Sequence, residues 1–253
     1  MNASRKSDDR LTKERDEVKD LNRKEIPASG IYPAGGKRND RPPVNVFQPF
    51  QKLAILVDWE NVRKSLFHKA PFVDYNDPRN LLRLFRALLE PDEVLYRIFL
   101  YVSSPLKPRS SIPEELKKEW EAGYRKHSAF LERISVCENI ALRKGFLRFK
   151  GIGVDDATGK KRLIFEQKQV DMLIGLDIAH LSFNRLVDRI LLFTADTDLI
   201  PAMKTARKNG LQVVIPVFED VPGYKVSRKI KEHADFLRRR NFRRIFGLEE
   251  NQT

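Results

Sequence analysis

The hydrophobic positions change their spacing from one segment of the chain to the next. Leu53–Val57 is continuously apolar, as expected of a strand buried on both faces of a sheet. Asn61–Ala70 then has a helical pattern. In Pro78–Leu89 the apolar residues recur at helical spacing, with Asp77 at the N-cap position and proline at the first helical position. Between residues 53 and 89 the sequence therefore predicts one strand followed by two helices.

Strand and helix patterns go on alternating toward the C-terminus. The hydrophobic spacing predicts strands over Val94–Val102, Ile140–Phe149, Arg189–Thr194 and Leu211–Val217. It predicts helices over Pro113–Ser135, Lys168–Leu181 and Asp198–Asn209. Such alternation is typical of an α/β fold with a mostly parallel central sheet flanked by helices. In folds of this class the ligand site lies at the carboxyl ends of the strands.

The two ends of the chain and its middle have weaker patterns. Residues 1–50 mix both charges with prolines and few apolar positions, which predicts a disordered or weakly structured tail. Glycines and aspartates in 151–162 indicate a turn, after which Arg162–Phe165 can return as a hairpin strand. We therefore predict three parts: the tail 1–50, a domain over 51–236, and a basic C-terminal extension over 237–253.

Length and composition narrow the class of protein. The chain has 253 residues, of which 41% are hydrophobic, and this is enough for one sizeable core. No apolar run reaches the roughly 18 residues that a membrane helix needs, so we expect a cytoplasmic protein with no membrane partner. A single cysteine, Cys137, excludes an intrachain disulfide, and with four scattered histidines it cannot form a Cys/His zinc site. Any metal would then be held by oxygen ligands.

The net charge of +13 is concentrated near the C-terminus. Residues 225–244 contain nine Lys and Arg against two Asp and Glu, which indicates a surface that binds RNA, including single strands. The predicted RNA-binding residues there are Arg228, Lys229, Arg238, Arg239, Arg240, Arg243 and Arg244. The alternative is a terminal helix with buried phenylalanines and solvated arginines. The RNA path would then lie elsewhere, with Arg143, Lys144, Arg148 and Lys150 as candidates.

Aspartates follow two of the predicted strands. Asp58 ends the first strand, Asp196 and Asp198 follow the strand Arg189–Thr194, and Asp171 opens the helix before it. Because carboxylates that cluster repel one another, such a group stays ionised when a cation neutralises it. Oxygen ligands of this kind select Mg²⁺ or Mn²⁺, which can activate water for phosphodiester hydrolysis.

The same aspartates allow a second interpretation. Asp58 and Asp196 can instead cap the helices that follow them, a common role for aspartate after a strand. Asp177 is a weaker candidate ligand than Asp171. It lies six residues further along the helix and therefore points roughly 120° away from it.

Three motifs, in this order, resemble those of NYN domains, the LabA-like branch of the PIN-like nuclease superfamily. Asp58-Trp59-Glu60-Asn61 is similar to the family's Asp-x-x-Asn opening. Lys168-Gln169-Val170-Asp171, with Asp177, resembles its Lys-x-Val-Asp helix and second acid. The segment 192–201, then 206–213, is similar to its Ser-Gly-Asp-Ser-Asp-Phe element and the strand after it. The likeness covers about residues 53–217, and 103–165 matches no family motif.

This resemblance implies a PIN-like sandwich and metal-dependent cleavage of RNA. It makes Asp58, Asp171 and Asp196 metal ligands, with Asp177 as a further candidate. Asp198 would share that role or orient water, and Asn61 would fix the geometry of the catalytic site. Ala195 replaces the family's glycine and Leu199 its phenylalanine, and neither change removes a ligand. Lys168 would neutralise the acids or contact a phosphate.

Three functions are compatible with these residues. The first is a divalent-metal-dependent endoribonuclease that uses Mg²⁺ or Mn²⁺, although the residues do not exclude DNA as the substrate. The second is a non-catalytic RNA-binding or assembly module that keeps the PIN-like fold. The third, a phosphatase-like pair at Asp196 and Asp198, lacks the threonine expected shortly after the second aspartate. The sequence leaves the oligomeric state open, with a homodimer as one alternative.

Overall fold

The computed structural model describes residues 50–155 and 159–248, so the predicted tail lies almost wholly outside it. Its strands are β1 (Gln51–Asp58), β2 (Glu93–Ser104), β3 (Ile140–Val154), β4 (Lys161–Lys168), β5 (Arg189–Phe193), β6 (Gln212–Val217) and β7 (Phe236–Arg239). They form one sheet in the order β4-β3-β2-β1-β5-β6-β7. Every neighbouring pair is parallel except β3 and β4. This confirms the predicted α/β class.

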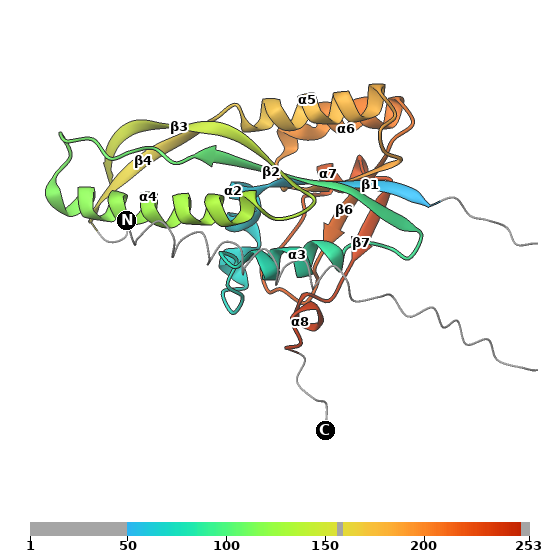
Figure 1. Ribbon diagram of the computed structural model, residues 1–253, viewed down its shortest axis with the longest axis horizontal. Helices are drawn as coiled ribbons and strands as arrows, with labels where there is room; N and C mark the ends of the chain where they lie inside the picture. The colour runs from blue at the N-terminus through green and yellow to red at the C-terminus, as the bar shows by residue number, and fades with distance from the viewer. Residues whose placement is uncertain (1–49, 156–158, 249–253) are drawn as a thin grey trace, which may run out of the picture. The chain divides into compact units, whose positions relative to one another are not determined.

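The helices lie on both faces of the sheet, as Figure 1 shows. They are α2 (Trp59–Ser65), α3 (Pro78–Arg86), α4 (Glu114–Ser135), α5 (Val170–Phe183), α6 (Ile200–Lys208), α7 (Arg228–Glu232) and α8 (Phe242–Ile245), with 3-10 turns η1 (Phe67–Lys69) and η2 (Thr197–Leu199). α5 and α6 cover one face, whereas α2, α3 and α4 lie on the other. The core is thus formed between each helical layer and the sheet.

Strand β1 is central in the sheet and pairs with both β2 and β5. Its apolar run Leu53–Val57 is completely buried, because helices cover both of its faces. Asp77 caps α3 as predicted, since its side chain accepts a hydrogen bond from the Arg79 N–H at 2.9 Å. Continuous apolar residues and a capping signal therefore located these elements correctly.

The segment 103–165, which resembled no family motif, forms a 22-residue helix and most of a long hairpin. The hairpin pairs β3 with β4, which confirms the expected return strand. Trp120 of α4 packs against the rings of Phe149 and Phe165, and its Nε1–H donates to the Leu106 carbonyl oxygen at 2.7 Å. Helix α4 and the hairpin therefore share a small apolar core of their own.

Strand β7 extends the sheet past the expected domain boundary. Its residues Phe236–Arg239 pair with β6, so the sheet runs across the boundary at 236 and 237 instead of ending before it. Phe242 of α8 is fully buried beside Phe218, at a ring-centroid distance of 5.1 Å. The basic residues of this region thus belong to an edge strand and a docked helix.

Arg238, a predicted RNA contact, has a structural role instead. Its guanidinium is buried and donates to both carboxylate oxygens of Glu93 at 2.7 Å, as well as to the Leu88 carbonyl oxygen. These bonds use both N–H groups of Nη1 and one of Nη2, and the buried guanidinium is thereby turned toward the protein instead of toward a phosphate. The prediction that Arg238 binds RNA is therefore corrected, and the residue joins the edge strand β7 to β2.

Within the described residues, no helix combines the length and the apolar character that crossing a bilayer requires.

We expect Arg238→Gln to lower the free energy of unfolding by roughly 2 to 3 kcal/mol, because it removes two hydrogen bonds from the buried Glu93 carboxylate and leaves Arg189 as its remaining cationic partner. Denaturant-induced unfolding followed by circular dichroism measures the change. Arg239→Gln is the matched control. Arg239 pairs with Glu219 at the exposed surface, and its loss should cost under about 1 kcal/mol. Equal losses in the two variants would contradict a structural role for Arg238.

Candidate functional site at the carboxyl edge of the sheet

Asp58 is the last residue of β1 and also the N-cap of α2. Its Oδ1 accepts a hydrogen bond from the Asn61 N–H at 3.2 Å, so the expected capping role is real. Its Oδ2 accepts a hydrogen bond from the Thr194 hydroxyl at 3.4 Å. A carboxylate has about four lone-pair positions, so these two bonds leave room for a further partner.

A second hydrogen bond fastens α2 to the loop after β5. The Asn61 Oδ1 accepts from the Ala195 N–H at 2.8 Å. The two segments are 134 residues apart in the chain but leave neighbouring strands at the same edge. Asn61 therefore connects the two loops that carry Asp58 and Asp196.

Asp198 lies in the turn η2, and Asp196 directly precedes this turn. Asp196 caps this turn, because its Oδ1 accepts from the Asp198 N–H at 2.9 Å. Its own N–H donates to the Thr194 hydroxyl oxygen at 3.1 Å. The side chain of Asp198 is exposed. Thr194 thus bonds to both Asp58 and the backbone of Asp196, and it connects the two acids.

Asp171 reaches this edge from the first turn of α5. The approach depends on Gly145 in β3, because a Cβ atom there would lie 2.4 Å from the Lys168 carbonyl oxygen. Gln169 then adopts a left-handed backbone conformation with φ of 72° before the helix begins. The close contact and the tight turn together direct the start of α5, and with it Asp171, toward the ends of β1 and β5.

The electrostatics of the edge show that the acids lie near one another. Burial raises the pKa of Asp58 to about 6, and the negative charges of Asp171 and Asp196 add to this rise, against the lowering effect of the Asn61 and Thr194 hydrogen bonds. The pKa of Asp171 is also raised, first by burial and then by Asp196 and Asp198. We call Asp58, Asp171, Asp196 and Asp198 the acidic edge.

The acidic edge fits a divalent cation by its chemistry. It offers only carboxylate oxygens, which are the donors that Mg²⁺ and Mn²⁺ prefer, and their mutual repulsion is what a cation would relieve. The carboxylates are not drawn into a tight cage. Across residues 50–155 and 159–248, no three His, Cys, Asp or Glu side chains are gathered into a group that could enclose a metal ion.

Asp177, the further candidate ligand, points away from the acidic edge. Its Oδ2 accepts from the Arg143 Nε–H at 2.8 Å and from the Tyr101 hydroxyl at 2.9 Å. The helical spacing predicted that Asp177 points away from Asp171, and the helix does turn this side chain toward β2 and β3. Its charge is balanced by Arg143, so the structure corrects its assignment as a ligand.

The predicted RNA-binding residues have different surroundings. Lys168, at the end of β4, pairs with Glu166 at 2.5 Å and is 40% exposed. The side chain of Arg228 is 92% exposed and pairs with Glu232 in the same short helix. Lys229 is exposed as well.

Between the start of β7 and the end of α8, Arg238 and Arg240 are engaged with the protein, whereas Arg239, Arg243 and Arg244 are exposed. Arg240 donates to Glu90 at 2.7 Å and to the Ala87 carbonyl oxygen. Arg243 lies over the ring of Phe72 but, like Arg244, is exposed. As for Arg238, contacts of Arg240 that span about 150 residues of sequence indicate a structural role, so the C-terminal run is only partly available to RNA.

Thr194 was not singled out from the sequence, although a signal for it existed. It occupies the position of the serine in the Ser-Gly-Asp element that Thr194-Ala195-Asp196 resembles. A hydroxyl in that place can bond two groups at once. The motif could therefore have identified it as the residue that connects the two acids.

The fold and the acidic edge define an α/β protein with clustered aspartates at the switch point of its sheet. A family model described as NYN domain matches residues 52–237. The chain therefore belongs to the NYN domain family, which has a PIN-like nuclease-type fold. Members of this family are generally nucleases, typically act on RNA and usually use divalent metals.

Comparison with solved structures adds only distant likenesses. A Vibrio parahaemolyticus protein of unknown function is 18% identical with a TM-score of 0.41, and the match covers 77% of this chain and 96% of that one. The catalytic domain of Thermotoga maritima CheB methylesterase is 10% identical with a TM-score of 0.34, over 79% and 97%. These scores are too low to support an argument about function. No curated protein matches the chain significantly.

Asp58→Asn should stabilise the metal-free protein at high pH. The folded state raises the pKa of Asp58 from 3.8 to about 6, so the stability of the protonated form is present below about pH 4 and is lost as the pH rises through 6. We expect the variant to gain roughly 1 to 3 kcal/mol in unfolding free energy at pH 8, and little at pH 4. Urea unfolding at both pH values measures this.

The asparagine of this variant keeps the cap of α2, since asparagine is an equally good N-cap residue. Asp198→Asn serves as the comparison, because that carboxyl is exposed at the same edge. A stability difference for Asp58→Asn that does not change with pH would show that ionisation of the Asp58 carboxyl is not its cause.

Proposed function

We propose that this chain is a divalent-metal-dependent endoribonuclease that hydrolyses RNA phosphodiester bonds at the acidic edge. The observation that carries the proposal is the convergence of Asp58, Asp171 and Asp196 from three separate elements, close enough that their charges add to the effect of burial on the pKa of Asp58. Helix capping needs only one acceptor side chain at each helix start, so it does not explain why three carboxylates from separate elements lie close together. A cytoplasmic location is part of the same proposal.

The side chains at this edge would have different roles in catalysis. Asp58, Asp171 and Asp196 would hold Mg²⁺ or Mn²⁺, which when bound supplies Lewis-acid charge and acidifies water. Asp198, exposed beside them, would accept a proton or orient the attacking water. Asn61 and Thr194 would keep Asp58 and Asp196 at a constant separation while the charge on the phosphate changes.

A second candidate function is an RNA-binding module without catalysis. The observation that favours it is that the carboxylates of the described residues do not form a closed metal-binding group. This candidate predicts RNA binding without strand cleavage in the presence of Mn²⁺. The endoribonuclease proposal predicts new internal ends in a mixed-sequence RNA, and these appear only when a divalent metal is added.

We expect Asp196→Asn to reduce metal-dependent cleavage at least about 100-fold, because it removes a carboxylate that would hold the ion. The fold should be kept, and Tm should stay equal or rise, since one of several mutually repelling charges is gone. Cleavage of an end-labelled RNA in Mn²⁺ and a thermal melt together measure both effects.

Asp188→Asn is the matched control for this variant. Asp188 lies just before β5, at the opposite edge of the sheet, where its carboxylate accepts from the Lys52 N–H. Asparagine can keep that bond. Wild-type cleavage by Asp196→Asn, or an equal loss in Asp188→Asn, would show that the acidic edge is not the catalytic site.

A further inference from the structure

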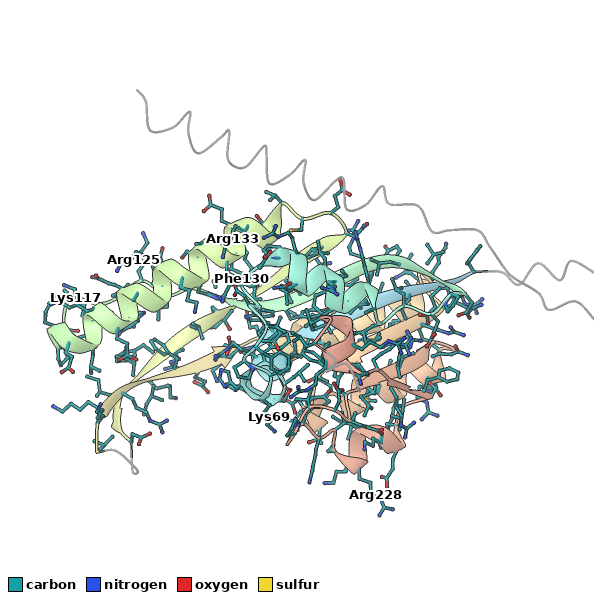
Figure 2. The ribbon with its side chains drawn as sticks, turned by 90° about the horizontal axis from the view of Figure 1, so that it is seen from below. Lys69, Lys117, Arg125, Phe130, Arg133 and Arg228 are labelled. Carbon is teal, nitrogen blue, oxygen red and sulfur yellow. The ribbon has the colours of Figure 1, made fainter. Side chains whose placement is uncertain are left out.

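A large groove lies beside the acidic edge, on the face that carries α2 and α4. Its volume is about 1210 Å³. One wall is formed by α4 and the hairpin β3–β4, and the other by α2, η1 and residues 71–76. Figure 2 looks onto this face and labels Phe130 of α4. Phe130 stacks on Trp59 of α2 at a centroid distance of 4.7 Å. The ring stack joins the two walls at the base of the groove.

Several residues that line the groove are close in sequence to the acids. Its lining residues Trp59 and Glu60 directly follow Asp58, and Ser103 stands near the end of β2, the strand next to β1. Gln167, on the hairpin side, directly precedes Lys168 and the turn into α5. A ligand in the groove therefore contacts the two residues that directly follow Asp58, and also Gln167, four residues before Asp171.

The lining combines aromatic rings with cationic side chains. Its partly exposed rings are Phe72, Tyr75, Tyr124 and Phe165, and its exposed cations are Lys64, Lys126 and Arg162. Of its three acids, Glu60 pairs with Arg63 at 2.8 Å, so Asp74 and Glu119 stand against the three exposed cations. Rings that can stack on bases, next to cations that can meet phosphates, are the chemistry by which proteins bind a single nucleic-acid strand.

Ser103 marks a place in the groove for a polar ligand. It is 3% exposed, and its Oγ is one of the few buried side-chain atoms of the described residues with no hydrogen-bond partner. The carbonyl oxygen of the same residue lies 2.9 Å from His127 Nε2. An unpaired hydroxyl in a buried position costs free energy, so a ligand that bonds to it would recover that cost.

The hairpin beside this groove has a large excess of basic side chains. Strands β3 and β4 together contain seven Lys and Arg against the single acid Glu166. Side chains alternate between the faces of a strand, so Leu147 faces the groove and Arg148 faces away from it. The other face also carries an exposed ring, Phe146, whereas the groove face offers several rings together with the unpaired Ser103 hydroxyl.

We propose that a single strand of RNA lies in this groove between the hairpin and α2, with one unstacked base beside Ser103. The inference rests on the proposed function and assigns the path by which the substrate reaches the acidic edge. Single strands are favoured over duplexes because bases held in a helix cannot stack on protein rings. Segment 103–165 would then supply the substrate-binding wall of the domain.

The test measures RNA binding without cleavage. A fluorescein-labelled, mixed-sequence single-stranded RNA is titrated in metal-free buffer, and the affinity is followed by fluorescence anisotropy over a range of salt concentrations. Lys126→Gln with Arg162→Gln removes two cations of the groove. If both contact phosphates, the slope of log affinity against log salt should fall by about 1.4.

The control is Lys118→Gln with Arg125→Gln, which removes two exposed cations of α4 that do not line the groove. Its slope should equal that of the wild type. Equal slopes in both double variants would overturn the proposal. A lower slope in Arg148→Gln with Lys150→Gln, and none in the groove variant, would place the RNA on the other face of the hairpin and overturn it as well.

Ser103→Ala tests the site of the unstacked base. Removing an unpaired hydroxyl should leave Tm unchanged or raise it, yet weaken RNA binding about threefold to tenfold, the range expected for one hydrogen bond. Ser128→Ala is the matched control, because its Oγ is also buried without a partner in the described residues but lies outside the groove lining. Unchanged affinity in Ser103→Ala would refute a base at this position.

These outcomes are separate from those that test catalysis. If the proposed function is wrong and the groove still binds RNA, the RNA will bind in the groove but will not be cleaved in Mn²⁺. Failure of this inference would leave metal-dependent cleavage intact, while the groove variants bind RNA as the wild type does.

Discussion

The parallel pairing of β1 with β5 is the constraint on which the candidate site depends. Their register aligns Val57 with Phe193, so Asp58 and the loop of Asp196 leave the sheet side by side. The hydrogen bond from Ala195 to Asn61 then fixes the two loops at close range. Without that register, the two acids would have no reason to meet, and the repulsion that adds to burial in raising the pKa of Asp58 would be lost.

The opposite edge of the sheet uses charge in another way. Glu93, at the start of β2, is fully buried and is balanced by Arg189 and Arg238, which belong to β5 and β7. Like charges gather at the carboxyl edge, whereas opposite charges are paired at the amino edge. The ion pairs at the amino edge connect strands that lie far apart in the sequence. The aspartates at the carboxyl edge lack such partners, so a bound cation would neutralise them.

Part of this arrangement could be predicted from the sequence, because it depends on local patterns. The apolar run of β1 and the aspartates after β1 and β5 placed the acids at one edge, and the fold class followed from alternating strands and helices. The turn of a helix also predicted that Asp177 diverges from Asp171. Each of these inferences needs only the residues near one element.

The remaining features depend on contacts between distant segments. Nothing in the run of arginines before residue 245 shows that Arg238 meets Glu93, since the two are 145 residues apart. Likewise, the groove arises only when α4 and the hairpin are packed across from α2. The charge of a segment could thus be counted from the sequence, but its availability to RNA could not.

The most direct test of the central claim is the anomalous scattering of Mn²⁺ in crystals of the wild-type protein soaked with that ion. The account predicts a peak at the acidic edge, within bonding distance of carboxylate oxygens of Asp58 and Asp196, and its absence from crystals of Asp196→Asn. A wild-type crystal with Mn²⁺ bound elsewhere and none at this edge would contradict the claim that these aspartates form a metal site.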